Sequence, residues 1–339
     1  MNQNIIKIGL FGFGRIGRNI FRLGLDNPKI KFQAISELGD AEAMHYLLMR
    51  DSIHGPLNKK VTLEKKNLKY ENNSVRLLKG GLPGTVPWDA FDVDIVIDTT
   101  GAYRKKAELE PHIESGAKRV IVCKPSIDNV DRMVIRGIND DQIRKNDKII
   151  STTSATTQGL ALMLKILDEN FDIENGMMTT IHAYTSDQPL ADTVRSDLRR
   201  SRSAVENIIP NETWAPNYVM KLLPQFKDKL TGMAMNVPIA NGSCIDLTTE
   251  MKSLPSVEEV NSAFEKASNE DLKGLIGYTD DPIVSSDAIG SGETIVFDSK
   301  ATMVSSDKFL KTISWFDNGW GFSNRVLELV DAYASLDKN

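Results

Sequence analysis

The pattern of apolar residues near the start of the chain predicts a strand, a glycine turn and a helix in direct succession. Residues 5–10 are mostly β-branched or otherwise apolar, which is typical of a strand. The pattern Gly-x-Gly-x-x-Gly follows from Gly12, and Ile16, Ile20 and Leu23 then recur at helical spacing. The helix is therefore expected to begin close to the end of the strand.

Further apolar runs predict additional strands of the same sheet. One run at 32–35 ends next to Glu37, and others follow at 93–98 and 119–122. The run at 93–98 leads into a Thr-Thr-Gly turn that contains Thr100. Strands of this kind predict a doubly wound α/β sheet, which places its ligand where the strands end.

The glycine turn is suited to a dinucleotide. Glycines let the backbone approach a pyrophosphate, and the amides at the start of the helix hold the phosphates. Glu37 can accept hydrogen bonds from ribose hydroxyls and repels a ribose phosphate, which favours NAD over NADP. The alternative for Glu37 is a solvated loop charge. The residues expected to contact NAD are Gly12, Gly14, Arg15, Ile16, Glu37, Thr100 and Gly101.

Two amphipathic helices are predicted in the rest of the chain. The apolar face of the first is formed by Leu160, Met163, Leu164 and Leu167. The apolar face of the second is formed by Val326, Leu329, Val330 and Tyr333. Ala155 is expected near the N-terminus of the first helix, where backbone amides attract anions.

Composition narrows the class of protein. The chain has 339 residues, which suggests two domains, and its net charge of −5 disfavours nonspecific attraction to nucleic acid or anionic membranes. It has no apolar run long enough to span a bilayer and no signal-peptide pattern, so a cytoplasmic protein is expected. Cys123 and Cys244 are expected to be buried small apolar side chains, and no spacing indicates a metal site.

The chain also carries a series of specific motifs. They lie at 12–18, 51–55, 151–157, 182–188, 197–202, 207–210, 284–287 and 315–318. In this order and spacing they resemble the glyceraldehyde-3-phosphate dehydrogenase family over essentially the whole chain. The resemblance implies an NAD-binding Rossmann domain at 1–154, an α+β catalytic domain at 155–321 and a C-terminal helix at 322–339 that returns to the first domain. It also implies a homotetramer that acts on a small-molecule substrate.

The resemblance assigns roles to individual residues. Ala155 occupies the position of the family's nucleophilic cysteine, and an alanine cannot form the covalent adduct. His182 matches the family's general acid and base, although a structural histidine left by ancestry is the alternative. Asn318 matches the residue that bonds the nicotinamide carboxamide. The residues at anion-binding positions are Ser154, Thr156, Thr185, Asp187 and Thr213.

Other departures from the family affect the substrate site. Asn236 stands where relatives have an arginine for the substrate phosphate, and Trp214 stands where a glycine exposes its amide. Because both anion sites are altered, natural divergence is favoured over an engineered Cys-to-Ala variant. Further differences occur at Phe11, Gln158, Gly159 and Gly319. A basic run has two interpretations, an anion or subunit contact and a solvated loop with surface ion pairs; it comprises Arg195, Arg199, Arg200 and Arg202.

Two hypotheses about function follow. The first is an NAD-dependent oxidoreductase that no longer forms a thioester and acts on a sugar, sugar phosphate or alcohol, with His182 as general base. The second is a catalytically silent NAD-binding relative with a regulatory or scaffold role. Loss of the nucleophile suits the second hypothesis, whereas retention of His182 and Asn318 favours the first.

Overall fold

The glycine turn near the N-terminus joins a strand to a helix, as the sequence predicts. In the computed structural model, β1 (Ile6–Phe11) leads into α1 (Arg15–Gly24), and β2 (Ile30–Glu37) follows. The first strand extends one residue beyond the prediction because Phe11 still pairs with Ser36 of β2. The structure describes residues 5–305 and 308–336.

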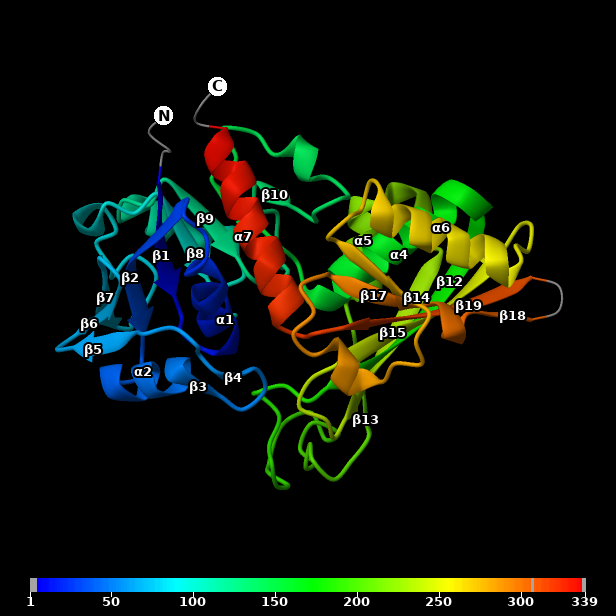
Figure 1. Ribbon diagram of the computed structural model, residues 1–339, viewed down its shortest axis with the longest axis horizontal. Helices are drawn as coiled ribbons and strands as arrows, with labels where there is room; N and C mark the ends of the chain where they lie inside the picture. The colour runs from blue at the N-terminus through cyan, green and yellow to red at the C-terminus, as the bar shows by residue number, and fades with distance from the viewer. Residues whose placement is uncertain (1–4, 306–307, 337–339) are drawn as a thin grey trace. The chain divides into compact units, whose positions relative to one another are not determined.

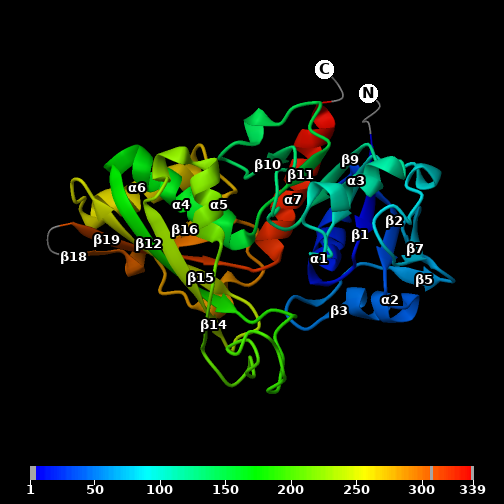
Figure 2. The same ribbon diagram turned by 180° about the vertical axis from the view of Figure 1, so that it is seen from behind.

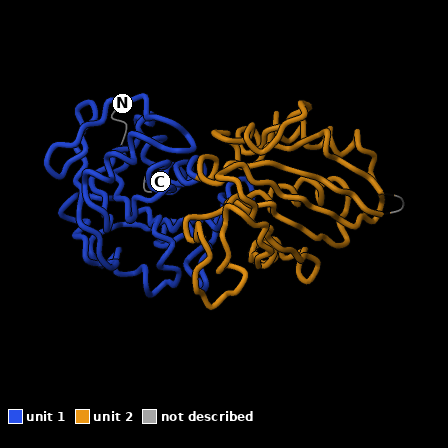
Figure 3. The backbone as a smooth tube through the Cα atoms, turned by 90° about the horizontal axis from the view of Figure 1, so that it is seen from below, with its two compact units in different colours: residues 1–154, 323–339 blue, residues 155–322 orange. Residues whose placement is uncertain are grey.

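A nine-stranded sheet lies at the centre of the first unit, which comprises residues 1–154 and 323–339 (Figures 1 and 3). In spatial order its strands are β10 (Arg132–Met133), β11 (Ile149–Ser151), β9 (Arg119–Val122), β8 (Ile95–Asp98), β1, β2, β7 (Asn73–Lys79), β6 (Asn67–Tyr70) and β5 (Thr62–Glu64). Neighbours pair in parallel except β6 with β7 and β5 with β6. The parallel sheet that the sequence predicts is confirmed.

The remaining elements of this unit surround the sheet. They include α2 (Ala41–Met49), α3 (Lys106–Glu114), two short 3-10 helices, η1 (Asp89–Phe91) and η2 (Asp140–Gln142), and a small two-stranded sheet of β3 (Arg50–Asp51) and β4 (Gly55–Pro56). The chain passes from β1 to β2 on one side and later returns to β8 on the other side of β1. This reversal creates a switch point at the carboxyl ends of β1 and β8, where doubly wound sheets bind ligands.

The C-terminal helix packs on the first unit through its last turns. α7 (Trp320–Ser335) begins two residues before the predicted start at 322, and the end of the predicted range, 337–339, lies outside the described residues. Arg119 of β9 donates a hydrogen bond of 2.6 Å to the Tyr333 carbonyl oxygen, and its guanidinium lies 4.6 Å from the centre of the Tyr333 ring. The predicted apolar face is fully buried: Val326, Leu329, Val330 and Tyr333.

The second unit, residues 155–322, is built on an eight-stranded mixed sheet (Figure 2). In spatial order its strands are β13 (Ile209–Asn211), β14 (Leu230–Val237), β12 (Ile173–Ala183), β15 (Ser243–Met251), β19 (Phe309–Phe316), β17 (Ile295–Asp298) and β16 (Ile276–Thr279), with β18 (Met303–Ser305) beside β19. Most pairs are antiparallel; β12 with β14 and β16 with β17 are parallel.

Three helices cover one face of this sheet (Figures 1 and 2). They are α4 (Ala155–Phe171), α5 (Ala215–Leu222) and α6 (Val257–Asn269). α4 packs in the middle, and its predicted apolar face is at most 1% exposed at Leu160, Met163, Leu164 and Leu167. Burial of this face fixes the helix on the sheet and so fixes the position of its first residue, Ala155.

Two absences hold for residues 5–305 and 308–336, which the structure describes. Over that part of the chain, no helix combines the length and apolar character needed to cross a bilayer. The same part of the chain contains no group of three His, Cys, Asp or Glu side chains placed to hold a metal ion.

Candidate active site

A cleft of about 290 Å³ opens at the switch point of the first unit. Its walls come from the glycine turn, from the end of β2 and from the turn after β8; they include Gly12, Gly14, Glu37, Leu38, Thr99 and Thr100. Arg15 and Ile16 form the start of α1 beside this cleft, and Gly101 directly follows Thr100. The structure therefore brings the residues of the first unit that are assigned to NAD together at one edge of the sheet, whereas Asn318 lies in the second unit.

The glycines of the turn leave room for a phosphate. Gly12 has a φ of +95°, and a Cβ there would lie 2.9 Å from Thr99 Oγ1. A Cβ on Gly14 would meet nothing within 4 Å, so this side of the turn is open. The N-cap residue of α1 is Gly14, so no side chain caps the helix. Its first amides can thus bind an anion, which is the role expected for a pyrophosphate cradle.

Glu37 is held against the glycine turn. Its Oε2 accepts a hydrogen bond of 2.6 Å from the Phe13 amide, and its Oε1 accepts one of 2.7 Å from the Leu38 amide. Each carboxylate oxygen has two acceptor positions, so both retain capacity for ligand hydroxyls. The residues of the cleft fit NAD at the turn and at Glu37.

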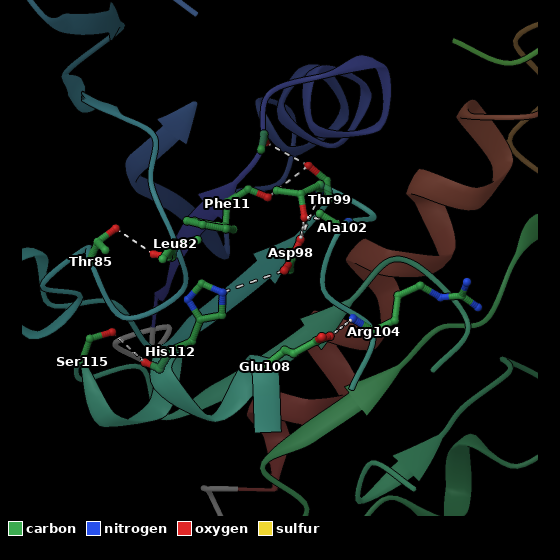
Figure 4. Close-up of polar contacts among 12 residues, drawn as sticks. Phe11, Leu82, Thr85, Asp98, Thr99, Ala102, Arg104, Glu108, His112 and Ser115 are labelled. Carbon is green, nitrogen blue, oxygen red and sulfur yellow. Dashed lines mark hydrogen bonds and ion pairs between the residues drawn. The ribbon is translucent and has the colours of Figure 1, made fainter. Parts of the chain in front are cut away.

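A buried polar cluster that no sequence motif predicts supports the wall of the cleft (Figure 4). Asp98 Oδ1 accepts hydrogen bonds from the Thr100 amide at 2.8 Å and the Thr100 hydroxyl at 2.6 Å. Asp98 Oδ2 faces His112 Nε2 at 3.9 Å, and Trp88 donates to His112 Nδ1 at 3.1 Å. Trp88, Asp98 and His112 come from different elements, so no local motif indicates the cluster.

The turn before α4 has an unusual backbone conformation. Thr153 lies in the left-handed region with a φ of +62°, which costs a β-branched residue about 1–3 kcal/mol. Its amide donates a hydrogen bond of 3.2 Å to Ser151 Oγ, which itself donates to the Lys124 carbonyl oxygen. This turn directs the chain into α4, where Ala155 is the first residue and is half-buried. Ser154 is also half-buried, whereas Thr156 is buried.

Neither cysteine can replace a nucleophile at Ala155. Cys123 and Cys244 are both free and buried, as the sequence analysis expects. Burial raises the pKa of Cys123 well above its ordinary value, and burial together with Asp246 raises the pKa of Cys244 to about 12. Both side chains are therefore neutral thiols at physiological pH.

His182 lies at the end of β12, in a defined hydrogen-bonding environment. Its Nδ1 lies 2.6 Å from the Ala183 carbonyl oxygen, which can only accept a hydrogen bond. Its Nε2 lies 3.2 Å from Nδ2 of Asn318, which can only donate. These two contacts match the tautomer that carries its proton on Nδ1 and its lone pair on Nε2.

Asn236 lies on the strand next to His182. β12 and β14 run parallel, and His182 is paired in register with Asn236. The Asn236 side chain is 6% exposed; its Oδ1 accepts a hydrogen bond of 3.3 Å from Asn211, and its Nδ2 lies 3.5 Å from the Ala183 carbonyl oxygen. A buried amide at this place provides no positive charge for a phosphate.

The segment after β12 uses its polar side chains within itself. Thr185 Oγ1 donates a hydrogen bond to Asp187, and Arg200 forms an ion pair with Asp187. Arg202 forms a second ion pair with Asp192 at 2.9 Å, on exposed side chains. These contacts match the interpretation of the basic run as a loop with surface ion pairs for Arg200 and Arg202.

Thr213 and Trp214 belong to a separate cavity of about 610 Å³ in the second unit. Trp214 is 62% exposed and precedes α5, and Thr213 Oγ1 accepts a hydrogen bond of 3.3 Å from the Ala215 amide. The charged and amide side chains that line the same cavity are Asp197, Arg199, Asn211, Glu212 and Asn217. The structure therefore groups Thr213 with Trp214, and His182 with Asn318 and Asn236.

Comparison with protein families identifies both parts of the chain. Residues 6–106 match the NAD binding domain of glyceraldehyde 3-phosphate dehydrogenase, and residues 154–318 match its C-terminal domain. The chain belongs to the glyceraldehyde-3-phosphate dehydrogenase family. Its fold is a Rossmann NAD-binding domain joined to the family's catalytic domain, and NAD is its cofactor.

Curated members of the glyceraldehyde-3-phosphate dehydrogenase family are similar to the chain over nearly its full length. The glyceraldehyde-3-phosphate dehydrogenase of Streptomyces coelicolor is 44% identical over 328 residues, covering 96% of this chain and 97% of that protein. The enzyme of the same name from Geobacillus stearothermophilus is 42% identical over 331 residues, which cover 97% of this chain and 98% of that protein. Glyceraldehyde-3-phosphate dehydrogenase 1 of Bacillus subtilis is 41% identical, with 96% and 97% covered.

Proposed function

We propose that this protein is an NAD-dependent oxidoreductase of its family that works without a covalent thioester. The observation that carries the proposal is the pair of contacts at His182: Nδ1 faces the Ala183 carbonyl oxygen and Nε2 faces the Asn318 amide nitrogen. Nε2 can therefore act as a general base once a substrate hydroxyl replaces that amide, although position 155 lacks a nucleophile. Ala155, Asn236 and Trp214 together support natural divergence of the substrate site. The family also supports a homotetramer.

The missing cysteine restricts the substrate. In the thiol mechanism, the sulfur adds to an aldehyde and so creates the oxygen-bearing carbon that loses hydride. An alcohol, a hydrated aldehyde or a cyclic hemiacetal already has that carbon and its hydroxyl. His182 Nε2 takes the hydroxyl proton while the C–H bond breaks and a C=O bond forms. NAD, when bound, supplies the hydride acceptor.

The cavity at Trp214 supports a polyhydroxylated substrate. It adjoins the strand pair that carries His182, because its lining residue Asn211 hydrogen-bonds Asn236, which is paired in register with His182. An exposed indole offers a flat surface for the apolar face of a sugar ring. Arg199 supplies hydrogen-bond donors, Glu212 supplies acceptors, and Asn217 supplies both. The two carboxylates of Asp197 and Glu212 outnumber the single guanidinium of Arg199, which disfavours a phosphate here. The proposed substrate class is therefore a sugar or related alcohol, with a sugar phosphate as the less favoured member.

A second candidate function is that of a catalytically silent NAD-binding subunit. The loss of the nucleophile at Ala155 and of a positive charge at Asn236 favours it. Retention of His182 with an oriented partner, Asn318, counts against it, because a binding subunit has no need of a proton acceptor.

The test is NADH formation by the purified protein with a panel of sugars, sugar phosphates and simple alcohols. We expect activity with at least one sugar or alcohol and a loss of about 100-fold or more in kcat for His182→Asn. His45→Asn is the matched control, because His45 hydrogen-bonds the Val61 carbonyl oxygen on the first unit. If the protein binds NAD but oxidises nothing on the panel, the silent-subunit function replaces the proposal.

A further inference from the structure

Hydrogen bonds join Ser243, Asn318, His182 and the Ala183 backbone in a closed ring. Ser243 is the first residue of β15 and is fully buried. Its Oγ accepts a hydrogen bond of 2.9 Å from the Ala183 amide and lies 2.7 Å from Asn318 Oδ1. Asn318 Nδ2 lies 3.2 Å from His182 Nε2, and His182 Nδ1 lies 2.6 Å from the Ala183 carbonyl oxygen.

Two backbone groups of Ala183 have fixed roles in this ring, and the remaining contacts are consistent with them. The Ala183 amide can only donate, so Ser243 Oγ accepts there and directs its own proton to Asn318 Oδ1. That contact places the carboxamide nitrogen of Asn318 toward His182. At the other end the Ala183 carbonyl can only accept, which places the imidazole proton on Nδ1. The two ends match the same tautomer.

A turn of the Asn318 carboxamide would break this arrangement. Its oxygen would then face His182 Nε2, and the proton of Ser243 would have no acceptor at Asn318. A buried hydroxyl proton without a partner is destabilising, because nothing replaces the hydrogen bond that it makes to water in the unfolded chain. The Asn318 backbone is held as well, because its amide donates a hydrogen bond of 2.8 Å to Asn241 Oδ1. The main chain of Asn318 is therefore fixed independently of Ser243.

We propose that Ser243 is a positioning residue that orients the Asn318 carboxamide and thereby keeps the His182 lone pair on Nε2, covered by an amide hydrogen until a ligand replaces it. Ser243 touches no reacting atom in this role; it acts through Asn318. The role of these hydrogen bonds in catalysis rests on the proposed function, but the hydrogen bonds themselves do not depend on it.

The test measures how accessible Nε2 is, without any need for turnover. Diethyl pyrocarbonate modifies neutral imidazole nitrogens, and peptide mass spectrometry of the full-length protein gives the rate at each histidine. The reaction is run at an alkaline pH, where all ring nitrogens of interest are neutral. His45 serves as an internal reference, because it lies on α2 of the first unit.

We expect Ser243→Ala to raise the modification rate of His182 about fivefold, the effect of losing one hydrogen bond. Ser314→Ala is the matched control: Ser314 is also fully buried in the same sheet, and its Oγ has no hydrogen-bond partner within the described residues. This control is expected to leave the rate unchanged. If Ser243→Ala does not fold, Ser243→Cys preserves the volume with a much weaker donor and is expected to raise the rate as well.

A double-mutant cycle tests whether Ser243 acts through Asn318. Asn318→Ala alone should raise the rate at least as much as Ser243→Ala, and adding Ser243→Ala to it should have no further effect. An unchanged rate in Ser243→Ala, or an equal increase with and without Asn318, would overturn the inference. A lack of NADH formation would count against the proposed function and leave this result unaffected.

Discussion

The carboxylate of Glu37 accepts a hydrogen bond of 2.6 Å from the backbone amide of Phe13, in the middle of the glycine turn. Glu37 ends β2, and Phe13 lies between β1 and α1, so the contact joins two βα segments at the mouth of the cleft. The same carboxylate is thus both a brace for the turn and a group that can receive ribose hydroxyls.

Glu37→Gln should weaken NAD binding by about tenfold, because a neutral amide is a poorer acceptor than a carboxylate. NADP binding should weaken less or improve, since the repulsion of a ribose phosphate is removed. Calorimetric titration with NAD and with NADP measures the two dissociation constants and so their ratio. Glu71→Gln, on an exposed residue of the same unit, is the control. An unchanged preference would mean that Glu37 only braces the turn.

Trp214→Ala should raise the KM for a sugar substrate about fivefold, because the stacking surface is lost. Trp214→Phe should retain most of the affinity, since it keeps an aromatic ring. The rate of NADH formation at varied sugar concentration gives the KM of each variant. The cavity would not be the sugar site if the alanine and phenylalanine variants had the same KM as the parent protein.

Ala155→Cys should create a reactive thiol. The new side chain would lie at the N-terminus of α4, where backbone amides stabilise a thiolate. Iodoacetamide should therefore modify it at neutral pH about tenfold faster than an unfolded cysteine, while Cys123 and Cys244 stay unmodified in the native protein. Intact-mass measurements over time follow the reaction. Slow modification at position 155 would show that the turn does not activate a nucleophile.

Asp51→Asn should lower stability at neutral pH and have less effect in acid. The His54 imidazole at 3.5 Å, followed by the backbone amides of His54 and Ile53 at 2.9 Å, holds the pKa of Asp51 well below its ordinary value. The carboxylate therefore stabilises the fold above the unfolded pKa of about 3.9, and this contribution is lost as the pH falls through the lower folded value.

We expect Asp51→Asn to lower the unfolding free energy by about 2 kcal/mol at neutral pH. The difference from the parent protein should become smaller below about pH 4. Denaturant unfolding at several pH values measures it. Asp26→Asn is the control, since Asp26 pairs with Lys59 on an exposed side chain and should change stability little. If the difference in unfolding free energy between the parent protein and Asp51→Asn did not change with pH, ionisation of Asp51 would not be its cause.

Local patterns in the sequence predict much of this fold. The strand and glycine turn at Gly12 are visible because apolar spacing and the need for close backbone approach both act over a few residues. The same holds for α4, whose apolar face is set by helical repeats, and for the buried cysteines. The early start of α7 was not predicted, because Trp320 and Gly321 precede its apolar repeat.

The sequence by itself determined the family, the NAD-binding turn, the absence of sulfur at Ala155 and the candidate base His182. Only the tertiary structure decided which atoms these residues face. His182, Ser243 and Asn318 are far apart along the chain and meet only because β12, β15 and the segment after β19 are adjacent in one sheet. Hydrogen bonds depend on distances and directions across strands, which no local pattern of residues encodes.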